Sequence, residues 1–196
     1  MNNKDTEEQY RQQFSKWSLW LDMAKELTRT AKILDEHVDK DWSDFRLITN
    51  NIKNDTHKQI ASPRLQDIQF MLYSYALENY FKAIIMFADP KISENPAKIE
   101  KHIKTHKLPQ LAEDAKFKAT SEEKELLLKL WRNADWQGRY PVPMSPKKLS
   151  IKYYTESNRT CSTVYGSEDH NAIKQLIKRV ESHINTIIKR NEPSNA

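Results

Sequence analysis

The chain has 196 residues and a formal net charge of +5, with 38% hydrophobic and 30% charged residues. This length and composition suit a single domain with a moderate hydrophobic core. Because the chain contains only two glycines and few valines, hairpin-rich β folds and glycine-rich phosphate loops are disfavoured and helices are favoured.

Membrane and disulfide classes are also disfavoured. No apolar run approaches the ~20 residues that a membrane span needs, and the polar N-terminal segment lacks the apolar middle of a signal peptide. The single cysteine, Cys161, excludes an internal disulfide and a cysteine-rich zinc site. We therefore expect a cytoplasmic protein without a membrane partner.

Residues 6–40 predict one long amphipathic helix. Apolar side chains recur every three or four residues and form one stripe along the helix. The stripe consists of Tyr10, Phe14, Trp17, Trp20, Ala24, Leu27, Ala31, Leu34 and Val38. A shorter helix is expected at about 42–50, followed by an asparagine-rich loop.

Residues 62–89 predict the central helix. Ser62 is a suitable N-cap and Pro63 fits the first helical position. Apolar and aromatic side chains then cover more than one face, which is typical of the middle helix of a bundle. Glu78 and Lys82 have the spacing of a helical ion pair. The pair either lies at the surface, or it is partly buried and takes a further partner such as an arginine.

Shorter elements are expected further along the chain. Amphipathic helices are predicted at 91–104 and 109–117, and Thr120 with Glu123 has the spacing of a capping box that opens another helix. That helix is expected to end at Gly138 as a left-handed stop.

Residues 139–167 contain three prolines and no helical period, so a long loop is predicted, with an extended piece at 151–154. The last helix begins after Ser167, and isoleucine and valine residues form its inner stripe. The pattern therefore predicts an all-α fold, a bundle of about five to six helices with one long loop between the last two. We expect one domain, with an N-terminal helix and connector at 1–61, a core at 62–190 and a tail at 191–196.

Positive charge is concentrated towards the C-terminus. Residues 139–190 carry a net charge of +6, and the remainder carries −1. Such a surface attracts phosphate groups or an acidic partner. The alternative is an ordinary solvated helix face with a soluble loop.

The segment at 131–143 holds the strongest candidates for anion binding. Arg132, Arg139 and Tyr140 lie near a helix end, where two guanidinium groups and a phenol can hold a phosphate. Alternatively, Arg132 pairs with Glu78 or Asp135 and Tyr140 only closes the end of the bundle.

Two histidines, His102 and His106, are four residues apart, which is the spacing of half a metal site. The sequence offers no third ligand or general base beside them, so surface or capping roles are favoured and no metal or cofactor is expected.

Two segments resemble the HEPN superfamily of small helical bundles. Residues 75–85, YALENYFKAII, are similar to the central helix of that family, and residues 105–111, THKLPQL, resemble its His-x-Leu-x-x-Leu segment. Residues 138–143, GRYPVP, are similar to an ending found in uncharacterised bacterial and phage members. The resemblance covers about residues 62–190, so the predicted core is HEPN-like.

The resemblance implies a bundle that often dimerises, with links to toxin–antitoxin, phage-defence and RNA-processing systems. Many members are metal-independent ribonucleases with an arginine and a histidine that are separated by four to six intervening residues. Arg132 and Asn133 match the first half of this signature, but no histidine stands at positions 137–139. Imidazole is the usual group for activating a ribose hydroxyl, so catalysis is left open.

These considerations lead to two hypotheses about function. In the first, the protein binds RNA or a nucleotide phosphate and is a degenerate or atypical ribonuclease. Its expected catalytic residues are Arg132, Asn133 and His106, its phosphate-binding residues are Arg132, Arg139 and Tyr140, and Glu78 orients an arginine. In the second, the chain is a non-enzymatic interaction module, which forms a homodimer or binds a partner protein through the aromatic N-terminal helix with Trp17 and Trp20.

Overall fold

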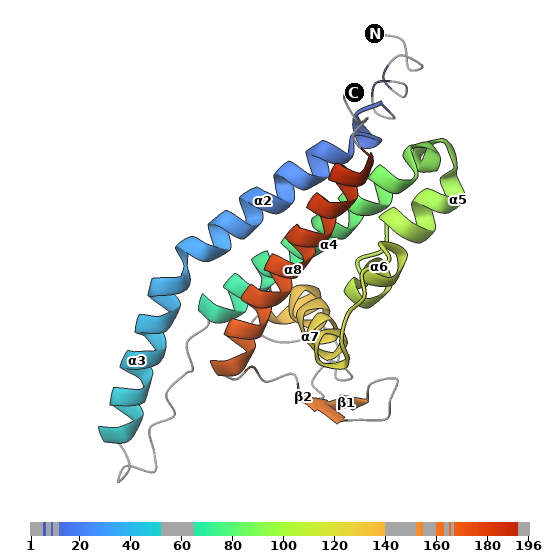
Figure 1. Cartoon of the computed structure of the whole chain (residues 1–196). Coiled ribbons are helices and arrows are strands. Elements are labelled where there is room, and N and C mark those ends of the chain that lie inside the picture. Colours follow the sequence, from blue (N-terminus) through green and yellow to red (C-terminus); the bar gives the residue numbers. More distant parts are fainter. Residues whose placement is uncertain are drawn as a thin grey trace.

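A computed structural model describes residues 12–51, 65–139, 152–154, 160–162 and 167–191, together with positions 6, 9 and 165. These residues form an all-α bundle with one short hairpin (Figure 1). The helices are α2 (Trp17–Ile33), α3 (Asp35–Asn51), α4 (Leu65–Ala88), α5 (Pro96–Lys98), α6 (Leu108–Asp114), α7 (Ser121–Arg132) and α8 (Ser167–Asn191). The other helical segments are η1 (Pro90–Glu94, 3-10), η2 (Ile99–Ile103, π) and η3 (Asn133–Gln137, π).

The hairpin lies in the segment between α7 and α8 for which a loop was predicted. Strand β1 (Lys152–Tyr154) pairs antiparallel with β2 (Thr160–Ser162), with Tyr153 opposite Cys161. The extended piece expected at 151–154 is therefore confirmed for its last three residues. Among the described helices, none combines the length and apolarity required to cross a bilayer.

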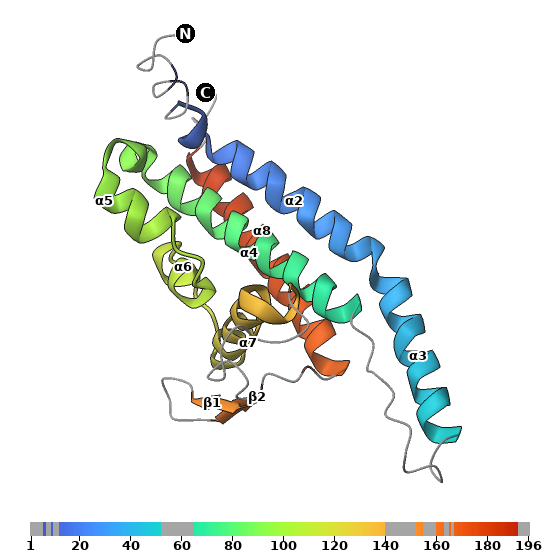
Figure 2. The same ribbon diagram turned by 180° about the vertical axis from the view of Figure 1, so that it is seen from behind.

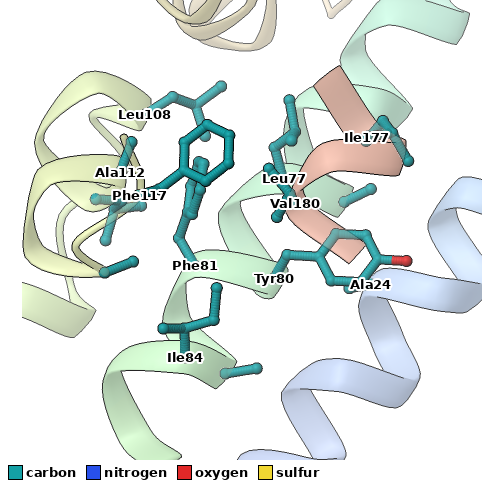
Figure 3. Close-up of a cluster of buried hydrophobic side chains, with 14 of the residues drawn as sticks. Ala24, Leu77, Tyr80, Phe81, Ile84, Leu108, Ala112, Phe117, Ile177 and Val180 are labelled. Atoms are coloured by element: carbon teal, nitrogen blue, oxygen red, sulfur yellow. The ribbon is translucent and has the colours of Figure 1, made fainter. Parts of the chain in front are cut away.

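Helix α4 is the centre of the bundle, as its apolar composition predicted. Helix α2 lies along one side of it and α5 and α6 lie on the opposite side, whereas α8 lies in front of α4 in Figure 1 and behind it in Figure 2 and contacts both α4 and α7. Figure 3 shows why both sides of α4 are apolar: Phe81 points towards Phe117 near α6, whereas Tyr80 points towards Ala24 of α2. The Tyr80 hydroxyl donates to Glu181 of α8 at 2.8 Å, and burial, followed by that hydrogen bond, raises the pKa of Tyr80 above its usual range.

The prediction of one helix over residues 6–40 is wrong in its boundaries. Helix α2 ends at Ile33, Leu34 forms a turn, and α3 then runs from Asp35, so the short helix expected at 42–50 is part of α3. The break coincides with tertiary contacts of Asp35, whose carboxylate contacts Lys174 of α8 at 2.7 Å and Gln69 of α4 at 2.7 Å. These contacts hold the first turn of α3 against the bundle and fix the bend.

The apolar stripe of the N-terminal helix is confirmed for its described members. Ala24, Ala31 and Val38 are buried, and the flanking aromatic residues are half-buried against the core. Trp17 packs edge-on against Phe87 of α4, with ring centroids 5.0 Å apart. Tyr10 of this stripe and the expected Ser62–Pro63 start of the central helix lie outside the described residues.

The other predicted helices are found with shifted ends. The expected helix at 91–104 is divided into η1, α5 and η2, and Asn95 accepts hydrogen bonds from two backbone amides at the start of α5. The capping box of α7 is present, with Thr120 and Glu123 bonded reciprocally. The inner stripe of α8 is buried at Ile173, Ile177, Val180 and Ile184.

Gly138 is a close-approach glycine and not the predicted left-handed stop. Its φ is not positive. A Cβ at this position would lie 2.6 Å from the Met71 Cβ and 2.9 Å from the carbonyl oxygen of Asp67 on α4. The glycine is required because the chain leaving η3 passes directly against the backbone of the central helix.

We therefore expect Gly138→Ala to destabilise the fold by about 2 kcal/mol, because one of the two close neighbours is backbone and cannot move aside. Urea unfolding of the variant against the wild type measures this difference. A variant as stable as the wild type would contradict the close packing of residue 138 on α4.

Candidate functional site

Glu78 is a buried carboxylate in the middle of α4. Its Oε1 accepts hydrogen bonds from Lys82 Nζ at 2.6 Å and, in the tautomer with a proton on Nδ1, from His106 at 2.9 Å. Lys82 is itself buried, with 4% of its side chain exposed, and its ammonium group lies 5.4 Å from the ring centroid of Trp20. The Glu78–Lys82 ion pair is confirmed and is buried. The side chains seen to hydrogen-bond to Glu78 are Lys82 and His106, and the role of Glu78 in orienting an arginine stays a prediction.

The two histidines of the HIKTH segment, His102 and His106, do not lie together as ligands of one metal site. His106 follows η2 in a non-helical stretch, and 72% of its side chain is exposed. His102 lies within η2 and contacts Asp114 of α6 at 2.7 Å. Among the described residues, no group of three potential metal ligands comes together. The two imidazoles instead connect the η2 region to two carboxylates.

The expected phosphate-binding residues lie around η3. Arg132 ends α7 and is half-buried, Arg139 is exposed, and each takes part in an interaction within the protein. Asn133 is fully buried, and neither its amide nitrogen nor its amide oxygen has a hydrogen-bond partner among the described residues. Tyr140 lies outside the described residues.

Two groups of expected site residues reach α4 at different levels. Gly138, next to Arg139, approaches α4 at Asp67 and Met71, whereas His106 contacts it at Glu78. The latter contact is about two helical turns further along α4 than Met71, or about 10 Å. Gly138 and His106 therefore contact α4 at different levels.

A basic groove of about 380 Å³ lies elsewhere, between the α6–α7 connection and the C-terminal half of α8. Its described lining contains four lysine and arginine side chains, one histidine and no carboxylate. The lining residues are Lys116, Phe117, Lys118, Arg179, Ser182, His183, Thr186 and Arg190. We call this feature the basic groove.

The floor of the basic groove is an aromatic ring. Phe117 is buried, and the Arg179 guanidinium lies 5.2 Å from its ring centroid. The His183 ring stands edge-on to Phe117 at 5.6 Å, and its Nε2 lies 3.3 Å from the carbonyl oxygen of Ala115. Because the ring and the backbone hold these two side chains, the floor of the groove is preorganised.

The charge of the basic groove is only partly balanced inside the protein. Arg179 pairs with Glu123 and donates to the carbonyl oxygen of Lys118. Among the residues that the structure describes, Lys116, Lys118 and Arg190 form no ion pair with a carboxylate. Three exposed cations therefore remain for an anionic ligand.

Lys116 occupies a conformation that normally belongs to glycine. It follows the end of α6 with a φ of 54°. The Phe117 amide donates to the Ala112 carbonyl and the Lys116 amide to that of Glu113, which is the hydrogen-bond pattern of a Schellman motif. A non-glycine residue in this left-handed region costs about 1 kcal/mol. A lysine at this position therefore lowers the stability of the fold, and its side chain lines the basic groove.

Sequence reasoning found only half of the basic groove. The positive excess of residues 139–190 included Arg179 and Arg190, but Lys116 and Lys118 were not identified. The available signal was the Lys-Phe-Lys run at 116–118, in which an aromatic residue stands between two cations.

Comparisons of the chain with protein-family models, with curated proteins and with solved structures gave no match. The site must therefore be interpreted from its own geometry.

Proposed function

We propose that this protein binds RNA, and that the basic groove holds the phosphate groups. The observation that carries the proposal is the set of unbalanced cations, Lys116, Lys118 and Arg190, around a groove without a carboxylate in its lining. Cations that displace counterions from a phosphate backbone are the main source of affinity for nucleic acids. The open, exposed position of these side chains suits a chain that passes across the surface.

The HEPN-like sequence features support the same substrate class, because that family is linked to RNA processing, toxin–antitoxin systems and phage defence. They also suggest the cytoplasm as the compartment. The proposal is limited to binding, because the described lining of the basic groove does not include Arg132, Asn133 or His106. Cleavage by a metal-independent route through Arg132, Asn133 and His106 remains a prediction, as does phosphate binding by Arg139 and Tyr140.

The test is binding of a labelled single-stranded RNA across a salt series. If three phosphates are neutralised, the slope of log affinity against log salt is expected to be about −2. Arg132→Ala with Arg139→Ala serves as the comparison, because it removes the other candidate phosphate contacts. If this double variant loses affinity and variants of the basic groove do not, binding is assigned to the η3 region. If the wild type shows no salt-dependent binding, the proposal is rejected.

Lys116→Gly separates binding from stability. Glycine adopts the left-handed conformation without strain, so we expect the variant to be about 1 kcal/mol more stable than the wild type in urea unfolding. Because a cation of the basic groove is lost, RNA binding is expected to weaken in the same variant, by about threefold to tenfold at low salt. If the affinity is unchanged while the stability rises, Lys116 has no part in binding.

A further inference from the structure

His183 uses one nitrogen of its ring for a contact within the protein. Its side chain lines the basic groove, and its Nε2 lies 3.3 Å from the carbonyl oxygen of Ala115. Because a carbonyl oxygen only accepts hydrogen bonds, Nε2 carries the proton in this contact. The neutral imidazole has one ring proton, so Nδ1 then holds a lone pair. Among the described residues, no group donates a hydrogen bond to Nδ1.

Two neighbours fix the orientation of the His183 ring. The ring stands edge-on to Phe117, with centroids 5.6 Å apart and an interplanar angle of 70°, and the Ala115 carbonyl holds its Nε2. Turning the ring over would place a carbon at the position of Nε2 and lose the hydrogen bond. The lone pair of Nδ1 is therefore held in place before any ligand binds, which lowers the entropic cost of using it.

This lone pair does not suit a groove that holds phosphates alone. The four lysine and arginine side chains of the lining carry donors and no acceptor, and phosphate oxygens only accept. The Ser182 hydroxyl donates as well as accepts, so it also suits a phosphate, and the Thr186 hydroxyl donates to the Ser182 carbonyl at 2.8 Å within α8. Nδ1 of His183 differs from all of these, because two acceptors form no hydrogen bond. It requires a ligand group that donates.

An RNA strand carries such a donor beside its phosphates. The 2′-hydroxyl of ribose donates and accepts, and it is the group by which a protein distinguishes RNA from DNA. We propose that Nδ1 of His183 accepts a hydrogen bond from a ribose 2′-hydroxyl while the cations of the basic groove hold the neighbouring phosphates. This assignment rests on the proposed function, because it requires a strand in the basic groove. His183 is thus a specificity-determining residue, and the groove is expected to prefer RNA to DNA.

Fluorescence anisotropy with three oligomers of one pyrimidine sequence tests this preference. The oligomers are RNA, its 2′-O-methyl derivative and DNA that contains deoxyuridine, so all three present the same donors on their bases. At about pH 8, where imidazole is ordinarily neutral, the wild type is expected to bind RNA about threefold to tenfold more tightly than either analogue, which is the range that one hydrogen bond provides. Weaker binding of the 2′-O-methyl derivative alone would show a steric effect and contradict the proposal.

Two substitutions of His183 remove the acceptor in different ways. His183→Phe keeps an aromatic ring against Phe117 but has no nitrogen, and it is expected to lower the affinity for RNA to that of the wild type for DNA. His183→Lys carries donors only, so it is expected to bind RNA and DNA more tightly than the wild type and without preference. The matched control is His37→Phe, because His37 is an exposed histidine of α3, and it is expected to retain the preference. Thermal unfolding confirms that each variant is folded.

A salt series separates failure of this assignment from failure of the proposed function. Equal, salt-dependent binding of RNA and DNA by the wild type would leave phosphate binding intact and overturn the role of His183. A preference for RNA that persists in both His183 variants would also overturn it, because another group then contacts the ribose. Absence of salt-dependent binding to all three oligomers would reject the proposed function and this assignment together.

Discussion

Reversing two charges of the basic groove, by Lys118→Glu together with Arg190→Glu, is expected to weaken RNA binding roughly 100-fold at low salt. Both side chains are exposed, and among the described residues neither pairs with a carboxylate, so the substitutions remove phosphate contacts without breaking an internal ion pair. The salt dependence should change with the affinity. Loss of two phosphate contacts lowers the slope for a single strand by about 1.4.

The control for this experiment changes the net charge by the same amount at two lysines that do not line the basic groove. Lys91→Glu with Lys101→Glu alters two exposed lysines in η1 and η2. Fluorescence anisotropy with the same RNA is expected to show a small loss for the control and a large one for the groove variant. Equal losses in the two variants would mean that RNA responds only to net charge, and the basic groove would not be a binding site.

Removing the buried ammonium group from α4 is expected to have the largest effect on stability. Lys82→Met leaves the Glu78 carboxylate in the core, and among the described residues His106 is then its remaining side-chain hydrogen-bond partner. Removal of one member of a buried ion pair leaves the other charge without a partner and lowers the free energy of unfolding by about 3 to 5 kcal/mol. Replacing both members, with Glu78→Leu and Lys82→Met, is expected to restore most of this stability because no buried charge remains.

An exposed ion pair of the same length provides the comparison. Lys98 contacts Asp89 at 2.6 Å, the distance that separates Lys82 from Glu78, but about half of its side chain is exposed. Lys98→Met is therefore expected to leave the urea midpoint almost unchanged, because solvent screens such a pair. If Lys82→Met is as mild as Lys98→Met, the pair in α4 is solvated and the double variant gives no recovery.

The helices could be predicted from the sequence because their buried side chains recur every three or four residues. The inner stripes of α2 and α8 and the apolar girth of α4 follow directly from residue spacing. The bend at Leu34 could not be predicted in this way, since leucine is a good helix former and the stripe continues through it. The bend depends on contacts of Asp35 with Gln69 and Lys174, which are distant in sequence.

The candidate site was harder to predict than the fold. The two sides of the basic groove are more than 60 residues apart, and no period connects them. Gly138 stood out in the sequence, but its role depends on how closely α4 approaches, which residue type alone does not specify. The role of Glu78 was predicted only in part, because the helical spacing indicated Lys82 and gave no sign of His106.

Helix α3 carries five carboxylates against two basic side chains, whereas the exposed cations of the basic groove lie around the C-terminal half of α8. Figure 1 shows these two elements at opposite ends of the molecule. These two described elements carry charge of opposite sign, so a polyanion is attracted towards one and repelled by the other before any contact forms. For the RNA binding proposed above, we expect this difference to turn α3 away from the phosphates during the first encounter.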